Sequence, residues 1–197
     1  MLADDTPRHR PLSAEVEVRP ARPEDAALLH LWRAEKTVRR YQPLAPLSTS
    51  QLRSELASRR ADDLWRSRGD RFDWIVLVHR QPAGWITLVV HSWEHGLAEC
   101  GYSLSTAFQG RGLMRKALSR LIGDLFARTR LHRLEARTAL ANVASQKVLE
   151  KLGFRREGTL RGYFQLDGEW VDNYLFAIVK EDWLLQQRAR RSDGDGA

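Results

Sequence analysis

The sequence predicts an α/β fold with a central mixed sheet, on three observations. Several short runs of alternating apolar residues have the period of two that is typical of strands, whereas other runs repeat at three and four residues, as amphipathic helices do. The two kinds of run follow one another without an internal repeat or a low-complexity linker. A chain of 197 residues, 43% of them hydrophobic and seven of them Trp, is long and apolar enough for one substantial core.

The N-terminal third predicts one strand and two helices. Apolar alternation predicts a strand over residues 15–20. Residues 24–34 are predicted to form a helix whose apolar face consists of Ala27, Leu28, Leu31 and Trp32. Pro43 and Pro46 interrupt the chain, and a second helix is predicted over residues 51–68. That helix begins behind a cluster of capping residues, Ser48, Thr49 and Ser50.

The middle of the chain predicts three consecutive strands. Residues 72–79 and 85–91 are strongly apolar runs, and the Pro- and Gly-containing segment 80–84 between them predicts the turn of a hairpin. A further strand is predicted over residues 97–104, in which every second residue is apolar or aromatic, namely Ala98, Cys100, Tyr102 and Leu104.

The turn Gln109-Gly110-Arg111-Gly112-Leu113-Met114 follows that strand and opens an amphipathic helix. The apolar residues of this helix recur at three and four, namely Leu113, Ala117, Leu118, Leu121, Ile122 and Leu125. A glycine-containing turn at a helix start exposes unpaired N–H groups and the positive end of the helix dipole, which suits a phosphate or pyrophosphate. Gly110 and Gly112 allow close approach to the backbone, and Arg111 adds a cation. The turn is not a P-loop, because no Gly-Lys-Ser/Thr follows, nor a dinucleotide fingerprint, because the third glycine is missing.

A second strand–helix unit follows, with its strand predicted over residues 132–138. Asn142 is predicted to cap the next helix and Gly153 to stop it. The apolar face of that helix is predicted to contain Ala144, Val148, Leu149 and Leu152. A strand after this helix, a turn at residues 166–168 and a last strand over residues 170–179 complete the predicted sheet.

Residues 15–185 are predicted to form a single domain. Residues 1–14 and 186–197 are predicted to be flexible tails, because both ends are polar, contain Pro or Gly and lack periodicity. The net charge is +7 and the isoelectric point is about 10.1. Such a surface suits phosphates, an acidic substrate surface or RNA, but a solvated basic surface without a partner is the favoured interpretation.

Several features place the chain in a reducing, aqueous compartment. No apolar run approaches the ~20 residues of a membrane span, and the first residues lack the pattern of a signal peptide. The single cysteine, Cys100, excludes an intramolecular disulfide, so a cytoplasmic location is predicted. Cys100 lies on the apolar face of its strand and is interpreted as a buried small hydrophobe. His91 and His95 flank Trp93 without accompanying ligands, and no metal site is predicted.

Taken together, two motifs resemble the acetyl-coenzyme A (acetyl-CoA) site of the GNAT N-acetyltransferase superfamily. They are Gln-x-x-Gly-x at Gln109 and Asn-x-x-Ser-x-x-Val-Leu-Glu-Lys-Leu-Gly-Phe at Asn142. Residues 98–102, 156–158 and 167–172 resemble its bacterial ribosomal-protein serine/alanine N-acetyltransferase branch. The resemblance covers roughly residues 16–183. It implies a GNAT-like fold, with a mixed, mostly antiparallel twisted sheet flanked by helices and acetyl-CoA in a cleft between the central strands.

The resemblance assigns acetyl-CoA binding to residues around the two helix starts, namely Leu104, Gln109, Gly110, Arg111, Gly112, Leu113, Met114, Asn142 and Ser145. It also assigns to Ser145 a catalytic role at the leaving thiolate. Two positions depart from the family: Leu149 stands where many GNAT enzymes have a general-acid Tyr, and residues 161–165 lack the carboxylate of the ribosomal-protein branch. The catalytic base is therefore Glu99 or a water molecule, or the enzyme has no base. Glu99 itself is either a carboxylate in the cleft or a solvated strand residue.

The predicted function is acetyl-CoA-dependent N-acetylation of a primary amine, a protein N-terminal α-amine, by direct transfer. An α-amino group titrates near about pH 8, so part of it is neutral in the cytosol and a strong base is less necessary than for lysine. Two alternatives remain open: a small-amine enzyme acting on an aminoglycoside or polyamine, and a non-catalytic acyl-CoA-binding or ribosome-associated module. No nucleic-acid partner is expected except through the ribosome, and a homodimer is left open.

Overall fold

The computed structural model describes residues 15–192, so residues 1–14 and 193–197 of the predicted tails lie outside it. Seven strands form one sheet in the order β1-β2-β3-β4-β5-β7-β6. Their bounds are β1 Val16–Pro20, β2 Arg71–Val78, β3 Gln81–Ser92, β4 Leu97–Leu104, β5 Arg133–Ala139, β6 Arg155–Leu166 and β7 Glu169–Val179. The α-helices are α1 Ala26–Ala34, α2 Lys36–Arg39, α3 Thr49–Ser58, α4 Leu113–Arg128, α5 Val143–Leu152 and α6 Lys180–Ser192. Three 3₁₀ turns complete the fold, η1 Pro23–Asp25, η2 Ala61–Arg66 and η3 Thr106–Phe108.

The sheet is mixed. Every neighbouring pair of strands is antiparallel except β4 and β5, which run parallel. This confirms the predicted mixed, mostly antiparallel sheet. The register between β4 and β5 covers only Leu97–Glu99 opposite Arg133–Glu135. Beyond it, β4 continues to Leu104 and β5 to Ala139 without pairing to each other, so the sheet parts in its middle.

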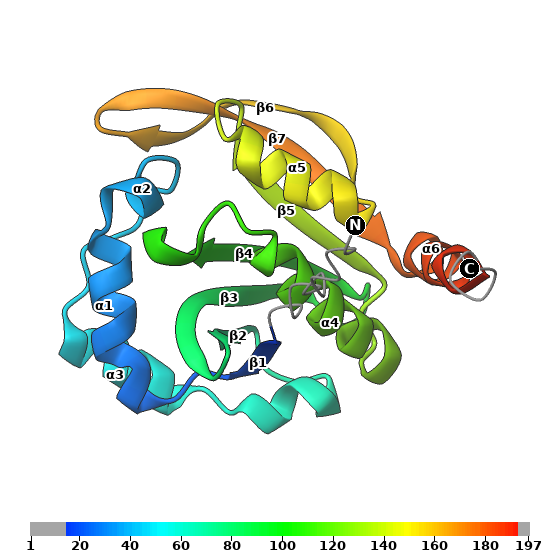
Figure 1. Ribbon diagram of the computed structural model, residues 1–197, viewed down its shortest axis with the longest axis horizontal. Coiled ribbons are helices and arrows are strands. Elements are labelled where there is room, and N and C mark those ends of the chain that lie inside the picture. The colour runs from blue at the N-terminus through cyan, green and yellow to red at the C-terminus, as the bar shows by residue number, and fades with distance from the viewer. Residues whose placement is uncertain (1–14, 193–197) are drawn as a thin grey trace, which may run out of the picture.

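Helices cover both faces of the sheet (Figure 1). Along β2, Trp74 and Val76 enter the core cluster that packs against α4, whereas Ile75 enters a second cluster with α1 and α3. In that second cluster the rings of Trp32 and Trp85 stack, with centroids 6.3 Å apart. The whole predicted apolar face of α4 is buried. Between residues 15 and 192, no helix is both long and apolar enough to cross a membrane.

The β2–β3 hairpin has a shorter turn than the sequence predicts. Only His79 and Arg80 lie between the strands, and their φ values of 48° and 64° are those of a two-residue type I′ turn. Pro82 therefore lies inside β3, where the register with β2 shifts between Val76 and Leu77. A bulge tolerates a proline because the ladder does not need the missing N–H there. The Pro and Gly residues thus mark an irregular strand rather than the turn.

Two N-terminal helices differ from the prediction. Of the predicted apolar face of α1, Trp32 is buried as expected, but Ala27 is exposed and Leu31 is 63% exposed. The other buried residues of the helix are Ala26 and Leu29. The helix follows the turn η1, whose last residue, Asp25, forms an ion pair of 2.7 Å with Arg19 of β1. The single helix predicted over residues 51–68 is divided, because Arg59 is extended between α3 and η2.

The folded part of the chain extends past the predicted domain boundary. Residues 186–192, predicted to belong to a tail, are the second half of α6. The buried ring of Trp183 docks this helix 6.5 Å from the ring of Phe126. Nη2 of Arg190 donates to the carbonyl of Lys151 at 3.0 Å. The prediction was wrong because tertiary contacts of a strongly charged segment, rather than a regular apolar stripe, hold this helix.

Candidate active site

The turn over residues 109–114 leads from β4 into α4 and is open in front. Gly110 and Gly112 have φ values of 73° and 71°, which residues with a Cβ rarely adopt. A Cβ at either position would meet no atom within 4 Å. Gly112 is the N-cap of α4 and makes no side-chain cap, so the first N–H groups of the helix are left for a ligand. The geometry therefore fits the predicted anion site.

Most side chains around this turn are held by the protein itself and do not point into the open space in front of the glycines. Nε2 of Gln109 donates to the carbonyl of Leu104 at 2.8 Å, which ties the turn to the end of β4. The side chains of Leu104, Leu113 and Met114 are buried in the core. These three residues can reach a coenzyme only through their backbone groups. Arg111 is exposed and supplies the cation of the turn.

The second helix start holds Ser145 against β4. The Oδ1 atom of Asn142 accepts a hydrogen bond from the Ser145 N–H at 3.2 Å, which confirms the predicted N-cap of α5. The Ser145 hydroxyl shares a hydrogen bond of 2.9 Å with the Tyr102 hydroxyl. Ala144, predicted on the apolar face of α5, is exposed, whereas the buried face contains Leu149 and Leu152. Both helix starts lie at the same edge of the sheet, because α4 follows β4 and α5 follows β5, and these two strands are parallel neighbours.

Tyr102 is a candidate functional residue that the sequence does not single out. Burial raises the pKa of its phenol, and the hydrogen bond with Ser145 offsets only part of that rise. Tyr102 therefore stays protonated near neutral pH and can donate a hydrogen bond to Ser145, but it cannot act as a base. Two residues earlier, Cys100 is buried, and burial raises the pKa of its thiol to about 12. This confirms the interpretation of Cys100 as a small hydrophobe.

Glu99 lies on the opposite face of β4 from Tyr102, because successive strand residues point to opposite faces. Its carboxylate forms an ion pair with Arg137 and lies 3.5 Å from Nε2 of His91. The structure therefore does not bring Glu99 and Ser145 together. Rather than a free carboxylate, Glu99 is one member of a network of charges.

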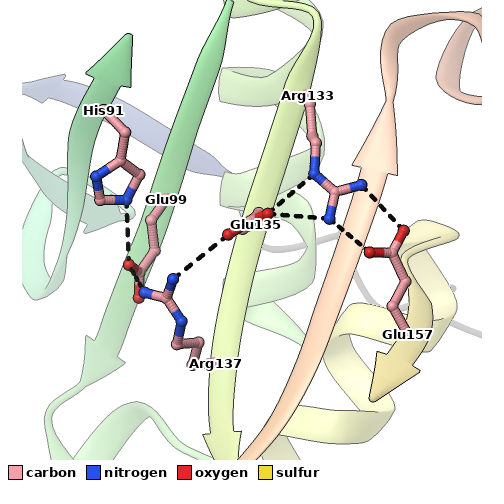
Figure 2. Close-up of polar contacts among 6 residues, drawn as sticks. All are labelled: His91, Glu99, Arg133, Glu135, Arg137 and Glu157. Carbon is pink, nitrogen blue, oxygen red and sulfur yellow. Dashed lines mark hydrogen bonds and ion pairs between the residues drawn. The ribbon is translucent and has the colours of Figure 1, made fainter. Parts of the chain in front are cut away.

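This network is an ion-pair ladder with members on four strands, which passes over β7 between β5 and β6, as Figure 2 shows. Its members are His91 on β3, Glu99 on β4, Arg137, Glu135 and Arg133 on β5, and Glu157 on β6. The bond from Arg133 to Glu157, 2.5 Å long, lowers the pKa of that carboxyl group. The ladder crosses β4 and β5 where their register ends. Over residues 15–192, no three His, Cys, Asp or Glu side chains gather as metal ligands would.

Glu35, in the junction between α1 and α2, is a second residue that local patterns do not reveal. Its carboxylate accepts hydrogen bonds from the Ser105 hydroxyl at 2.9 Å and from the Thr106 N–H at 2.7 Å. Burial alone would raise the pKa of Glu35, but these bonds and one from the Thr106 hydroxyl lower it. Glu35 thereby joins the N-terminal helices to the segment that precedes the glycine turn.

Comparison with known proteins adds an independent line of evidence. The model of the acetyltransferase (GNAT) domain family matches residues 15–155. The ribosomal protein uS5-alanine N-acetyltransferase of Escherichia coli (strain K12) is 37% identical over 83 residues, 42% of this chain and 43% of that enzyme. The spermidine N(1)-acetyltransferase of Escherichia coli (strain K12) is 25% identical over 178 residues, 90% of this chain and 93% of that enzyme.

A solved structure agrees with these matches. Mycobacterium smegmatis RimJ in complex with CoA-disulfide superposes with a TM-score of 0.74 and 27% sequence identity, covering 85% of this chain and 83% of that chain. The family match spans most of the sheet and both helix starts. The chain therefore belongs to the GNAT acetyltransferase family and is an N-acetyltransferase whose acetyl donor is acetyl-CoA.

Proposed function

We propose that this N-acetyltransferase acetylates a protein N-terminal α-amine by direct transfer from acetyl-CoA. The observation that carries the proposal is the Ser145 hydroxyl, which Asn142 and Tyr102 position at the start of α5, beside the parting of β4 and β5. The similarity to the uS5-alanine enzyme supports the choice of a protein terminus. A ribosomal-protein terminus as substrate is in keeping with a cytoplasmic location, which we also propose.

The glycine turn is proposed to hold the pyrophosphate of the coenzyme. The free N–H groups at the start of α4 point to that role, because they supply hydrogen bonds and the positive end of the helix dipole to an anion. Arg111 adds a charge that stays positive at every physiological pH. Asn142 keeps the first turn of α5 in place, so that the coenzyme's sulfur meets a fixed donor.

The chemistry needs proximity more than a strong base. The amine nitrogen attacks the thioester carbonyl, the C–N bond forms, and the C–S bond breaks as the sulfur leaves with its electron pair. The Ser145 hydroxyl donates a hydrogen bond to that sulfur, and Tyr102 in turn donates to the Ser145 oxygen. Water takes the proton from the amine and returns one to the thiolate, in keeping with an α-amine that titrates near about pH 8. Glu99 has no role in this mechanism, because its carboxylate pairs with Arg137 in the ion-pair ladder.

Acetylation of a small polyamine is the second candidate. It is favoured by the similarity to the spermidine enzyme, which spans 90% of this chain. A free-thiol release assay with acetyl-CoA separates the candidates when peptides beginning with Ala or Ser are compared with spermidine and an aminoglycoside. We expect the peptides to have the highest kcat/KM. A preference for spermidine would select the second candidate, and coenzyme binding without thiol release on any amine would select a non-catalytic module.

A further inference from the structure

A cavity separate from the candidate active site is lined by residues of α1, α3 and the strands β2 and β3. Figure 1 shows these two helices on one side of the sheet. Its volume is about 230 Å³. One part of its wall is apolar and contains Leu29, Leu47, Leu52, Leu56 and Trp85. The other part is charged and contains Arg33, Arg59 and Arg71 with only two carboxylates, Glu55 and Asp73. No residue of the glycine turn, the start of α5 or the ion-pair ladder lines it.

The charges in this wall are paired unevenly. Arg59 engages both carboxylates, through an ion pair with Asp73 and a contact of 2.9 Å with Glu55. Asp73 also accepts a hydrogen bond of 2.7 Å from the hydroxyl of Thr87. Nε of Arg71 approaches Asp73 only to 3.7 Å. The two acids are thus largely satisfied by Arg59 and Thr87, which leaves the cavity with one net positive charge.

Arg33 carries the uncompensated charge. Its Nη2 donates to the carbonyl of Ala45 at 3.0 Å, but its Nε is buried without a hydrogen-bond partner. Among the described residues, no carboxylate oxygen lies within ion-pair distance of Arg33. Burial and the neighbouring charge of Arg71 lower the pKa of Arg33. The carboxylates of Glu55 and Asp73 offset only part of that lowering. A guanidinium nevertheless stays charged in proteins, so an anion is the group that this corner of the cavity lacks.

We propose that this cavity binds a small monocarboxylate with an apolar body, its carboxylate between Arg33 and Arg71 and its body against the leucines and Trp85. Arginine forms paired hydrogen bonds with a planar carboxylate, and apolar walls with few polar groups are typical of small-molecule sites. A 150 Å³ cavity holds benzene, so this one admits a molecule of about ten non-hydrogen atoms.

The test is calorimetric titration of the full chain with benzoate and 4-methylpentanoate, using benzamide as a neutral analogue of benzoate. We expect saturable binding of at least one carboxylate at one site and none of benzamide. In Arg33→Gln the affinity should fall about tenfold or more. Arg53→Gln removes an exposed arginine from α3 and should leave the affinity unchanged. Circular dichroism and thermal melting establish that each variant is folded.

Two results would overturn the proposal. One is the absence of saturable binding of both carboxylates by the wild-type protein up to about 20 mM. The other is wild-type affinity in Leu52→Phe, which should fill the cavity while keeping every charge. Gly112→Val, which alters only the coenzyme turn, should bind the carboxylate normally. Because the readout is binding without turnover, failure here is distinguishable from failure of the proposed acetyl transfer.

Discussion

At the scale of single residues, the hydroxyl of Ser145 has two neighbours that restrict it. Asn142 fixes the backbone that carries it, and Tyr102 reaches it from β4 over a separation of 43 residues in the chain. A serine hydroxyl rotates freely unless a partner orients it. The pair therefore provides a donor with a defined direction, without a second charged group.

Ser145→Ala should lower kcat and kcat/KM together, roughly 10- to 1,000-fold, if, as proposed, its hydroxyl donates to the sulfur only in the transition state. The affinity for acetyl-CoA should barely change, since the ground-state thioester needs no such donor. Thiol release with the best amine measures the first effect and calorimetry the second. Ser54→Ala, an exposed serine on α3, is the control. A wild-type kcat in Ser145→Ala would leave proximity and the backbone as the only catalysts.

Tyr102→Phe keeps the ring and removes only the hydroxyl that orients Ser145. We expect kcat to fall about tenfold, the cost of one hydrogen bond, with acetyl-CoA affinity unchanged. The double variant with Ser145→Ala should be no slower than Ser145→Ala alone, because Tyr102 acts through Ser145. Independent, additive losses in that double-mutant cycle would show that Tyr102 contacts the reactants itself.

At the scale of elements, two helix starts meet where the parallel strands part. α4 begins behind β4 with a glycine N-cap, and α5 begins behind β5 with an asparagine N-cap. The first leaves its N–H groups free, whereas the second satisfies one of them internally. This difference suits an anion at α4 and an oriented hydroxyl at α5.

Gly112→Val should weaken acetyl-CoA binding by about tenfold or more, because a side chain would fill the open space in front of the turn. Its left-handed φ also costs about 1–2 kcal/mol of stability. Gly168→Val in the β6–β7 turn is the matched control, with a φ of 89° and equally open surroundings. Both variants should lose similar stability in urea, but only Gly112→Val should lose affinity. Unchanged affinity in folded Gly112→Val would contradict the pyrophosphate site.

Features with a local cause could be predicted from the sequence. The strand Leu97–Leu104 and the cap at Asn142 follow from alternation and from one short polar side chain. Features made by distant partners could not. Nothing in the sequence around Glu35 indicates that its carboxylate accepts hydrogen bonds from Ser105 and Thr106, which lie about 70 residues further along the chain. The charged second half of α6 is likewise helical because of what it packs against.

At the scale of the whole molecule, several carboxylates of this basic chain accept hydrogen bonds from neighbouring groups of the folded protein. Burial alone would raise the pKa of Asp25, but the hydrogen bonds from Arg19 and the Arg22 N–H lower it. The pKa of Glu35 is also lowered, by Thr106 and Ser105, and that of Glu157 by Arg133. These groups bind protons less readily in the folded chain than in the unfolded chain.

Stability should therefore fall in acid. Carboxyl groups in the unfolded chain titrate near about pH 4, so their contribution is fully present above about pH 5 and is lost as the pH falls through the lower folded values. The urea midpoint should drop between about pH 5 and pH 2.5. In Glu35→Gln the midpoint should be lower at pH 7 and should fall less in acid. A midpoint that stays constant over this range would exclude these pairs as a source of stability.

The short parallel register between β4 and β5 also bears on how the protein folds. The strands β2, β3 and β4 pair with their neighbours in sequence, and such local contacts form quickly. β5 joins β4 only after the chain has passed through α4, and only a few backbone pairs hold the two together. This seam should close last during folding and open first in hydrogen exchange. The proposed catalytic pair spans it, with Tyr102 on one side and Ser145 on the other, so its hydrogen bond can form only when the two halves of the sheet have come together.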